Sequence, residues 1–344
     1  MIDRSIINNN RDEIWTLDLI KYLLAILVII RHCGQAYWSY DSLFVKIFTC
    51  SVSPVAVPLF FAISGFLLFR RTVSASVLKK QLFRIIKLYL LWSLVFSPII
   101  VREAIRSKSI ALWLLGFIKE SLFGGAFYHL WFLPSLAVAL FLTYILAKKI
   151  KYNRYLLLIG FILYVIGTIV DTYHFFPPYT DWKLYKEVFL TTRNGIFFGF
   201  LFVVIGKTVA QSQTFIRNMK TSLVGFFTII GLMMLVVEGW FLCEVKYCSV
   251  VNMNFSSVIL APVILIIAIK ASDRLFYANG KLLRNMSTVL FCCHPLVMYV
   301  VSILNKPFRL DPTASTIMSF AFSALFAYLF VKLAVKIKFL NHFM

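Results

Sequence analysis

Charged residues are scarce in this chain of 344 amino acids. Asp, Glu, Lys and Arg together make up 14% of the residues, whereas 61% are hydrophobic. A soluble domain typically has about 25% charged residues. Among the charged residues the acidic ones are fewer, with 14 Asp and Glu against 35 Lys and Arg, which gives a formal net charge of +21. This composition excludes a soluble globule, because too few polar side chains are present to cover one.

Other absences narrow the possible functions further. No spacing of His and Cys resembles a zinc site, so no metal is expected. The first fifteen residues are polar and no small-residue cleavage site follows the first apolar run, so that run is expected to be retained. No internal repeat of the kind found in many transporters is visible. Cys243 and Cys248 flank a short loop, and they could form a disulfide outside the cytosol or remain two thiols.

What the chain has instead is long apolar segments that recur from end to end. A transmembrane helix needs about 20 consecutive apolar residues. Ten segments approach this length, at 15–38, 47–69, 84–101, 128–147, 154–171, 191–210, 221–242, 251–269, 285–304 and 314–335. We therefore predict an all-α integral membrane protein, a bundle of about ten transmembrane helices in the cytoplasmic membrane. The expected division is a short tail at 1–14, one transmembrane domain at 15–335 and a short basic tail at 336–344.

Lysine and arginine gather between the apolar segments. The connections after the second, fourth, sixth and eighth segments are basic, and short basic connections stay on the cytoplasmic side, so both termini are expected in the cytoplasm. The lipid bilayer accounts for most of this charge. No nucleic acid is expected as a partner, although part of the excess could attract an anionic cytoplasmic ligand. On the opposite side, Ile110 to Ile118 predicts an interfacial or re-entrant helix, because it is too short to span the membrane. The aromatic connection 172–190 predicts an interfacial belt or a cover over a site.

The first apolar segment contains four ionisable residues: Asp18, Lys21, Arg31 and His32. At about 100° per residue, the eleven steps from Lys21 to His32 make about three turns of helix. The two side chains therefore share one face and lie about 16 Å apart along the axis, with Asp18 one turn before Lys21. Ionisable groups at membrane depth usually face the bundle interior or a watery cavity. This stripe is therefore a candidate site that points across the membrane.

Five short patterns follow one another along the chain. They are Leu17-Asp18-x-x-Lys21 followed after ten residues by His32, Pro58-Leu59-Phe60-Phe61-x-x-Ser64-Gly65-Phe66, Arg84-x-x-Lys87, His129-Leu130-Trp131-Phe132-Leu133, and His294-Pro295. In this order they resemble the membrane-bound acyltransferase-3 family, over nearly the whole chain from about Trp15 to about Leu333. Lys21 and Lys87 stand where the family has arginine. Lysine still supplies charge but not the planar fork of arginine, which Arg84 keeps.

The resemblance implies an O-acyltransferase. Members of the family modify bacterial polysaccharides, lipopolysaccharide or peptidoglycan with acyl groups, usually acetyl. For this chain it implies acetyl-CoA, or another acyl-CoA, as a co-substrate rather than a bound cofactor. The acceptor would be a hydroxyl of an envelope glycan or of a lipid-linked sugar. His32 is then expected to be catalytic, as general base or as carrier of the acyl group, with Arg31 able to orient it.

The resemblance also gives roles to the cations. Lys21, Arg84 and Lys87 are expected to neutralise the phosphates of the acyl-CoA donor, which would approach from the cytoplasmic side. Asp18 could orient Lys21. Arg84 and Lys87, three residues apart, share a helix face, and simple anchoring to anionic headgroups would explain this spacing equally well.

The remaining motif residues have two readings each. His129 and Trp131 could bind an acceptor sugar, or they could anchor a helix at the interface. Ser64 could line the substrate path, or it could mark a close contact between helices. His294 precedes Pro295, which frees a backbone carbonyl that a polar group could use, and this favours a structural role.

A transporter or flippase of an anionic or sugar-linked substrate is the alternative function. Polar residues inside helices and a basic inner rim would suit it too. The ordered motifs and the lack of a repeat favour the enzyme. The acceptor, the length of the acyl group and the oligomeric state are left open by the sequence.

Overall fold

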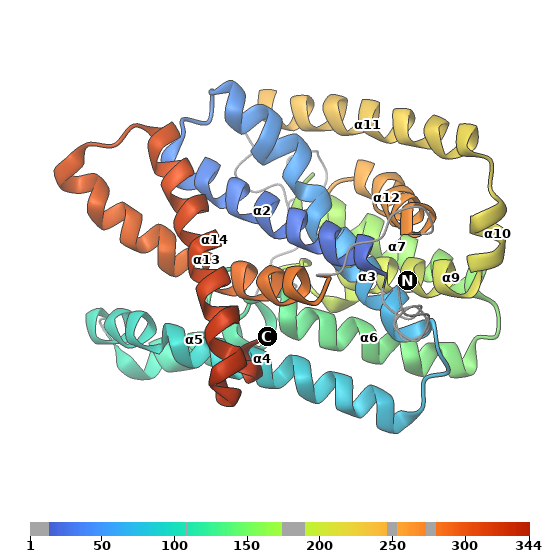
Figure 1. Cartoon of the computed structure of the whole chain (residues 1–344), viewed down its shortest axis with the longest axis horizontal. Helices are drawn as coiled ribbons and strands as arrows, with labels where there is room; N and C mark the ends of the chain where they lie inside the picture. The colour runs from blue at the N-terminus through green and yellow to red at the C-terminus, as the bar shows by residue number, and fades with distance from the viewer. Residues whose placement is uncertain (1–13, 108, 174–189, 246–252, 273–279) are drawn as a thin grey trace, which may run out of the picture.

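The computed structural model describes residues 14–107, 109–173, 190–245, 253–272 and 280–344, and within these ranges it contains helices and no strand. The helices, shown in Figure 1, are α2 (Trp15–Tyr37), the π-helix η1 (Val45–Val52), the 3-10 turn η2 (Ser53–Val55), α3 (Ala56–Phe69), α4 (Ala75–Arg106), α5 (Ile110–Phe123), α6 (Phe132–Lys149), α7 (Asn153–Asp171), the π-helix η3 (Gly195–Gly199), α9 (Phe200–Gln211), α10 (Gln213–Asn218), α11 (Thr221–Glu244), α12 (Ser256–Ser272), α13 (Gly280–Phe308), α14 (Pro312–Lys336) and the 3-10 helix η5 (Lys338–Phe343). The all-α fold class is confirmed over the described ranges.

Each of the ten apolar segments overlaps a helix, and α5 covers the expected interfacial piece. Seven helical stretches are long and apolar enough to cross a membrane, judged by length and composition: η1 to α3, α4, α6, α7, α11, α13 and α14. Two further apolar helices are shorter, at 195–211 and 256–272, and α2 is not among the seven. The count of about ten spans and the cytoplasmic termini stay predictions.

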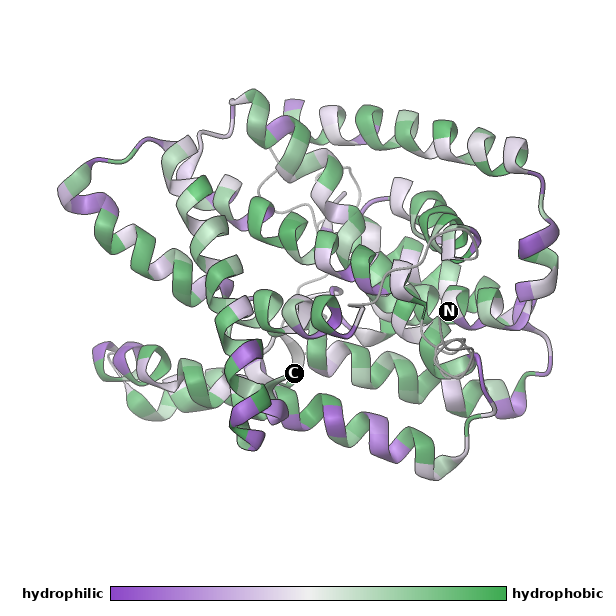
Figure 2. Ribbon diagram, in the orientation of Figure 1, coloured by the Kyte–Doolittle hydropathy of each residue, from purple (hydrophilic) through white to green (hydrophobic). Residues whose placement is uncertain are grey.

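The outer helices expose apolar side chains, as helices in contact with lipid do. Leu94 on α4 is 68% exposed, Val237 on α11 is 68% exposed and Val335 on α14 is 80% exposed. Figure 2 shows α11 as a largely hydrophobic ribbon along the top edge of the molecule. A face of this kind is stable only in an apolar solvent, which agrees with a multi-pass membrane protein.

Helices α3 and α9 form the most extensive helix contact in the described structure. Glycines allow it: a Cβ atom at Gly65 would lie 2.3 Å from the backbone oxygen of Val203, and one at Gly206 would lie 2.0 Å from that of Ala62. Small residues permit this close approach of two backbones. The neighbouring Ser64 donates its hydroxyl to Phe60 O of its own helix at 2.8 Å. Of the two readings of the Ser64-Gly65 pair, the geometry favours the helix contact.

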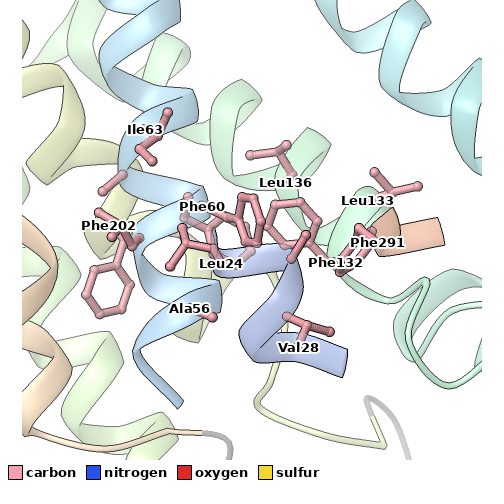
Figure 3. Close-up of a cluster of buried hydrophobic side chains, with 14 of the residues drawn as sticks. Leu24, Val28, Ala56, Phe60, Ile63, Phe132, Leu133, Leu136, Phe202 and Phe291 are labelled. Carbon is pink, nitrogen blue, oxygen red and sulfur yellow. The ribbon is translucent and has the colours of Figure 1, made fainter. Parts of the chain in front are cut away.

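A cluster of buried apolar side chains fills the middle of the bundle. Leu24 and Val28 of α2 point toward Phe60 of α3, Phe132 of α6 and Phe291 of α13 (Figure 3). The rings of Phe60 and Phe132 have centroids 5.8 Å apart, and those of Phe132 and Phe291 are 5.6 Å apart. The cluster therefore covers the stretch of α2 between its two ionisable ends.

The structure excludes one of the two alternatives expected for Cys243 and Cys248. Cys243 is in the thiol form, which excludes a Cys243–Cys248 disulfide. Cys50 is disulfide-bonded instead. Cys248 and most of the aromatic connection 172–190 lie outside the described residues.

Candidate active site

A cavity of about 340 Å³ lies where the second half of α2 meets the starts of α3 and α6, the end of α7 and the middle of α13. The polar side chains that line it are Arg31, His32, Gln35, Ser53, Tyr128, His129, Asp171, Thr191 and Arg193. His32 and His129, which lie far apart in the sequence, are therefore neighbours in the fold. We call this the histidine cavity.

His32 is held by a residue of its own helix. Its Nδ1 lies 3.1 Å from Oε1 of Gln35, three residues further along α2, a spacing that places both on one face. An amide oxygen can only accept, so Nδ1 carries the proton and donates it. Nε2 of His32 is then the nitrogen with the lone pair. Gln35 belongs to none of the motifs in the sequence, although its i, i+3 spacing from His32 is visible there.

His294 stacks on His32, with ring centroids 5.2 Å apart and an angle of 22° between the ring planes. Its Nδ1 donates to Phe291 O at 2.8 Å. Pro295 has no N–H for that carbonyl, so His294 satisfies an acceptor that the proline leaves without its helical donor. The expected structural role is thus present. Nε2 of His294 has no hydrogen-bond partner among the described residues.

His129 completes the group of imidazoles. It lies in the turn before α6, is 2% exposed, and donates from Nε2 to Cys292 O at 3.1 Å. Its ring centroid is 5.2 Å from that of His294, and Nδ1 has no hydrogen-bond partner among the described residues. Each of the three imidazoles therefore uses its single N–H on an oxygen and keeps a lone pair. Within the described part of the chain, no group of three or more His, Cys, Asp or Glu side chains is arranged to hold a metal ion.

Charge in the cavity comes from Arg31, Arg193 and Asp171. Arg31 donates to Thr49 O at 3.0 Å and acts electrostatically on His32, whose direct hydrogen-bond partner is Gln35. The carboxylate of Asp171 interacts electrostatically with both arginines. Asp171 and Arg193 carry no local motif and flank the 172–190 connection, so the sequence alone did not reveal them.

Trp131 lines the cavity but has little free surface. It is 7% exposed, the guanidinium of Arg193 lies 4.7 Å from its ring centroid, and Phe198 stacks on it at 5.8 Å. These contacts favour a structural role over stacking on a sugar. Tyr128, by contrast, is 48% exposed and its ring lies 5.0 Å from that of His32.

A larger cavity of about 850 Å³ adjoins the histidine cavity and shares Tyr128, Thr191 and Arg193 with it. We call it the outer cavity. Its further polar lining consists of Tyr37, Arg102, Glu103, Arg106, Glu120, Tyr299 and Ser302. Arg102 donates to the hydroxyl of Tyr299 at 2.9 Å. The mixed charges and aromatic rings suit a polar ligand such as a sugar.

The expected donor-binding cations lie toward the opposite end of α2. Nζ of Lys21 forms an ion pair with Asp18 at 2.7 Å, and Arg284 approaches the same carboxylate at 3.8 Å. Arg84 is near enough to act electrostatically on Lys21, and it donates to the main-chain oxygen of Met344 at 3.4 Å. The predicted Asp18–Lys21 pairing is therefore present.

Lys87 lies one turn beyond Arg84 on α4 and makes no ion pair with a described residue. Lys21 and His32 lie eleven positions apart on one helix, a rise of about 16 Å. The structure thus brings Lys21 and Arg84 together and holds His32 apart from them.

Comparison with known proteins agrees with this picture. The model of the acyltransferase-3 family, described as an acyltransferase domain, matches residues 14–332. No solved structure matches the chain significantly.

Among curated proteins, an amino-acid racemase of Enterococcus faecalis is 31% identical over 223 residues, which is 63% of this chain and 30% of that protein. A serine/alanine racemase of Enterococcus gallinarum is 30% identical over 233 residues, which is 63% of this chain and 32% of that protein. A second amino-acid racemase of E. faecalis is 27% identical over 84% of this chain and 42% of its own length. The chain thus spans less than half of each relative, and the racemase names describe those whole proteins. The family match covers nearly all of this chain, which therefore belongs to the acyltransferase-3 family of membrane acyltransferases.

Proposed function

We propose that this protein transfers an acyl group, most simply acetyl, from acyl-CoA to a hydroxyl of an envelope polysaccharide or a lipid-linked sugar. Membership of the family supports acyl transfer. The observation that carries the finer proposal is the hydrogen bond between His32 and Gln35. In the neutral imidazole it holds the proton on Nδ1 and leaves the Nε2 lone pair available, which is the form that a general base requires.

In the proposed reaction, Nε2 of His32 accepts the proton of the acceptor hydroxyl as the oxygen attacks the thioester carbonyl. The C–O bond forms, the C–S bond breaks, and the coenzyme A thiolate leaves. The imidazolium then returns the proton to the thiolate, so His32 ends the cycle neutral. The same lone pair could instead attack the thioester first and carry the acyl group, and both routes require Nε2 to be unprotonated.

The acyl-CoA donor is proposed to bind with its phosphates near Arg84 and Lys87. Lys21 contributes less net charge than expected, because Asp18 already neutralises it. The thioester would reach His32 from this end, a rise of about 16 Å along α2. The aromatic cluster around Phe60 and Phe291 covers that stretch, so the donor arm requires these rings to change rotamer.

The acceptor is proposed to bind in the outer cavity. A volume of about 850 Å³ is large enough for one or two sugar units. The exposed ring of Tyr128 lies between this cavity and His32, and we assign to it the sugar contact expected of Trp131. Glu103 and Glu120 supply acceptors for the sugar hydroxyls.

Mass analysis of envelope glycans tests the proposal in cells carrying the native protein, a His32→Ala variant or no protein. We expect an acyl mass with the native protein and at least a hundredfold loss with His32→Ala. His342→Ala is the matched control, because His342 is an exposed histidine outside both cavities. All variants are compared at equal levels in the membrane fraction.

Two results would overturn the proposal. Acylation that persists at the native level with His32→Ala would remove His32 from the reaction. Glycans that keep their acyl groups but change in amount or location would indicate transport instead. Release of free coenzyme A by the purified protein, dependent on the acceptor, separately tests the donor.

A further inference from the structure

A third cavity lies at the opposite end of α3, α6, α7 and α9 from the histidine cavity. Its volume is about 740 Å³. Five cations line it: Arg70, Arg71, Lys148, Lys151 and Lys207. None of the described residues that line it is acidic. We call it the basic cavity. The sequence motifs gave no indication of it, because its residues come from three separate stretches of sequence, at 69–73, 144–153 and 207–211.

Lys207 of α9 forms the buried part of this cavity. Lys207 is only 7% exposed. Its Nζ donates to Oδ1 of Asn153 at 2.5 Å and to Oε1 of Gln211 at 3.1 Å. Both partners are neutral amides, and Lys207 makes no ion pair with a described residue. A buried ammonium group is costly without a counter-charge. The amides orient Lys207, and no described residue balances its charge.

Two exposed lysines lie beside Lys207 in the cavity and keep donors available. Nζ of Lys148 lies 4.4 Å from the ring centroid of Tyr144, and Nζ of Lys151 lies 5.7 Å from that of Tyr152. Cation–π contacts at exposed sites are weak, about 0.5–1 kcal/mol, and they leave the ammonium hydrogens available to a ligand. Arg70 and Arg71 at the end of α3 also line the cavity.

We propose that the basic cavity binds the phosphate groups of an anionic ligand. A single carboxylate would balance one of the three lysines Lys148, Lys151 and Lys207, whereas a diphosphate or a pair of phosphodiesters would balance more of them. Two sources offer this chemistry: a soluble phosphorylated molecule, or the headgroup of an anionic lipid held between helices. The inference rests on the cavity and its charges and does not depend on acyl transfer.

The test uses the purified full-length chain in a non-ionic detergent and in lipid nanodiscs. Pyrophosphate and coenzyme A are the soluble probes, and the shift in the midpoint of thermal unfolding measures their binding. Nanodiscs of phosphatidylcholine with or without phosphatidylglycerol, followed by native mass spectrometry, report retained anionic lipid. The variants are Lys207→Met and the rim pair Lys148→Gln/Lys151→Gln, so that a folding defect in the first leaves the second available.

Lys79→Gln/Lys80→Gln is the matched control, because these exposed lysines on α4 lie outside the cavity and their loss removes the same charge as the rim pair. We expect pyrophosphate or phosphatidylglycerol to bind the native chain and the control alike, and at least tenfold more weakly to the cavity variants. Binding of the soluble probes identifies a soluble ligand, and retention of phosphatidylglycerol alone identifies a lipid headgroup. Equal weakening in the control, no weakening in the rim variant, or no binding to the native chain would overturn the proposal.

Discussion

The histidine cavity and the basic cavity lie at opposite ends of the same helices and offer opposite chemistry. Val57 lines the first and Arg70 the second, so they are about 20 Å apart along α3. In the histidine cavity every imidazole N–H is bound to an oxygen, and lone pairs are left over. In the basic cavity the lone pairs of the amides are occupied by Lys207, and positive N–H donors are left over.

This difference indicates what each end can bind. Unused lone pairs bind groups that donate hydrogen bonds, such as hydroxyls, and in the histidine cavity Asp171 offsets the charge of the arginines. Unused cations bind anions. A protein that meets an uncharged acceptor at one end and a phosphorylated ligand at the other needs this division.

The largest expected effect comes from breaking the contact between α9 and α3, the helix whose two ends line the two cavities. A leucine at Gly206 would force α9 away from Ala62 O, which is 2.0 Å from the added Cβ. We expect Gly206→Leu to cost more than about 4 kcal/mol, because the clash is with backbone, and to abolish both cavities together. Gly225→Leu is the control, since nothing lies within 4 Å of a Cβ there. Size-exclusion profiles in detergent would measure the folded fraction, and a monodisperse Gly206→Leu protein would contradict the prediction.

A second cation cluster, at the Lys21 end of α2, shows what a counter-charge does. Asp18→Asn would leave Lys21 and Arg284 without their shared carboxylate, and we expect a loss of about 3 kcal/mol. The double variant Asp18→Asn/Lys21→Met removes the charge on both sides and should recover most of that loss. Equilibrium unfolding in mixed detergent micelles would give both values. If Asp18→Asn alone left the free energy of unfolding unchanged, the attraction within the ion pair would only equal the cost of desolvating its charges.

A smaller effect is expected for the residue that orients His32. Gln35→Leu removes the acceptor of Nδ1–H, and both tautomers of the imidazole then become available. We expect about a tenfold fall in kcat with KM for the acceptor nearly unchanged. Gln35→Glu keeps an acceptor oxygen and should retain most of the activity, which a merely structural role of Gln35 would not predict. Equal losses in the two variants would contradict this role.

The smallest effect is expected in the basic cavity. Lys148→Gln/Lys151→Gln removes repulsion between exposed cations, so the ligand-free protein should become more stable by less than about 0.5 kcal/mol. The sign is opposite to that of Asp18→Asn, and thermal unfolding at low ionic strength would detect it. A loss of more than 1 kcal/mol would show that these cations already have a counter-charge.

Much of the fold follows from hydropathy, but the contents of the cavities do not. Runs of about 20 apolar residues predicted the ten helical segments, because backbone groups in lipid must bond within their own segment. The His294-Pro295 pair also predicted its own hydrogen bond, since a proline leaves one carbonyl without a donor.

Asp171, Arg193 and Lys207 could not be predicted in the same way. Their meaning depends on which segments meet in space, and no local spacing records that. The same limit applies to Trp131, whose ring is covered by Arg193 and Phe198, residues distant in the sequence.

The glycines between α3 and α9 have a mechanical consequence. Where the backbones of α3 and α9 touch, at Gly65 and Gly206, the two helices cannot slide or rotate past each other without a steric clash. The pair therefore behaves as one rigid element. The separation of the two cavities is then a constant of the fold. Ligands bound at the two ends must match that fixed length, and any movement that opens one end must carry the other with it.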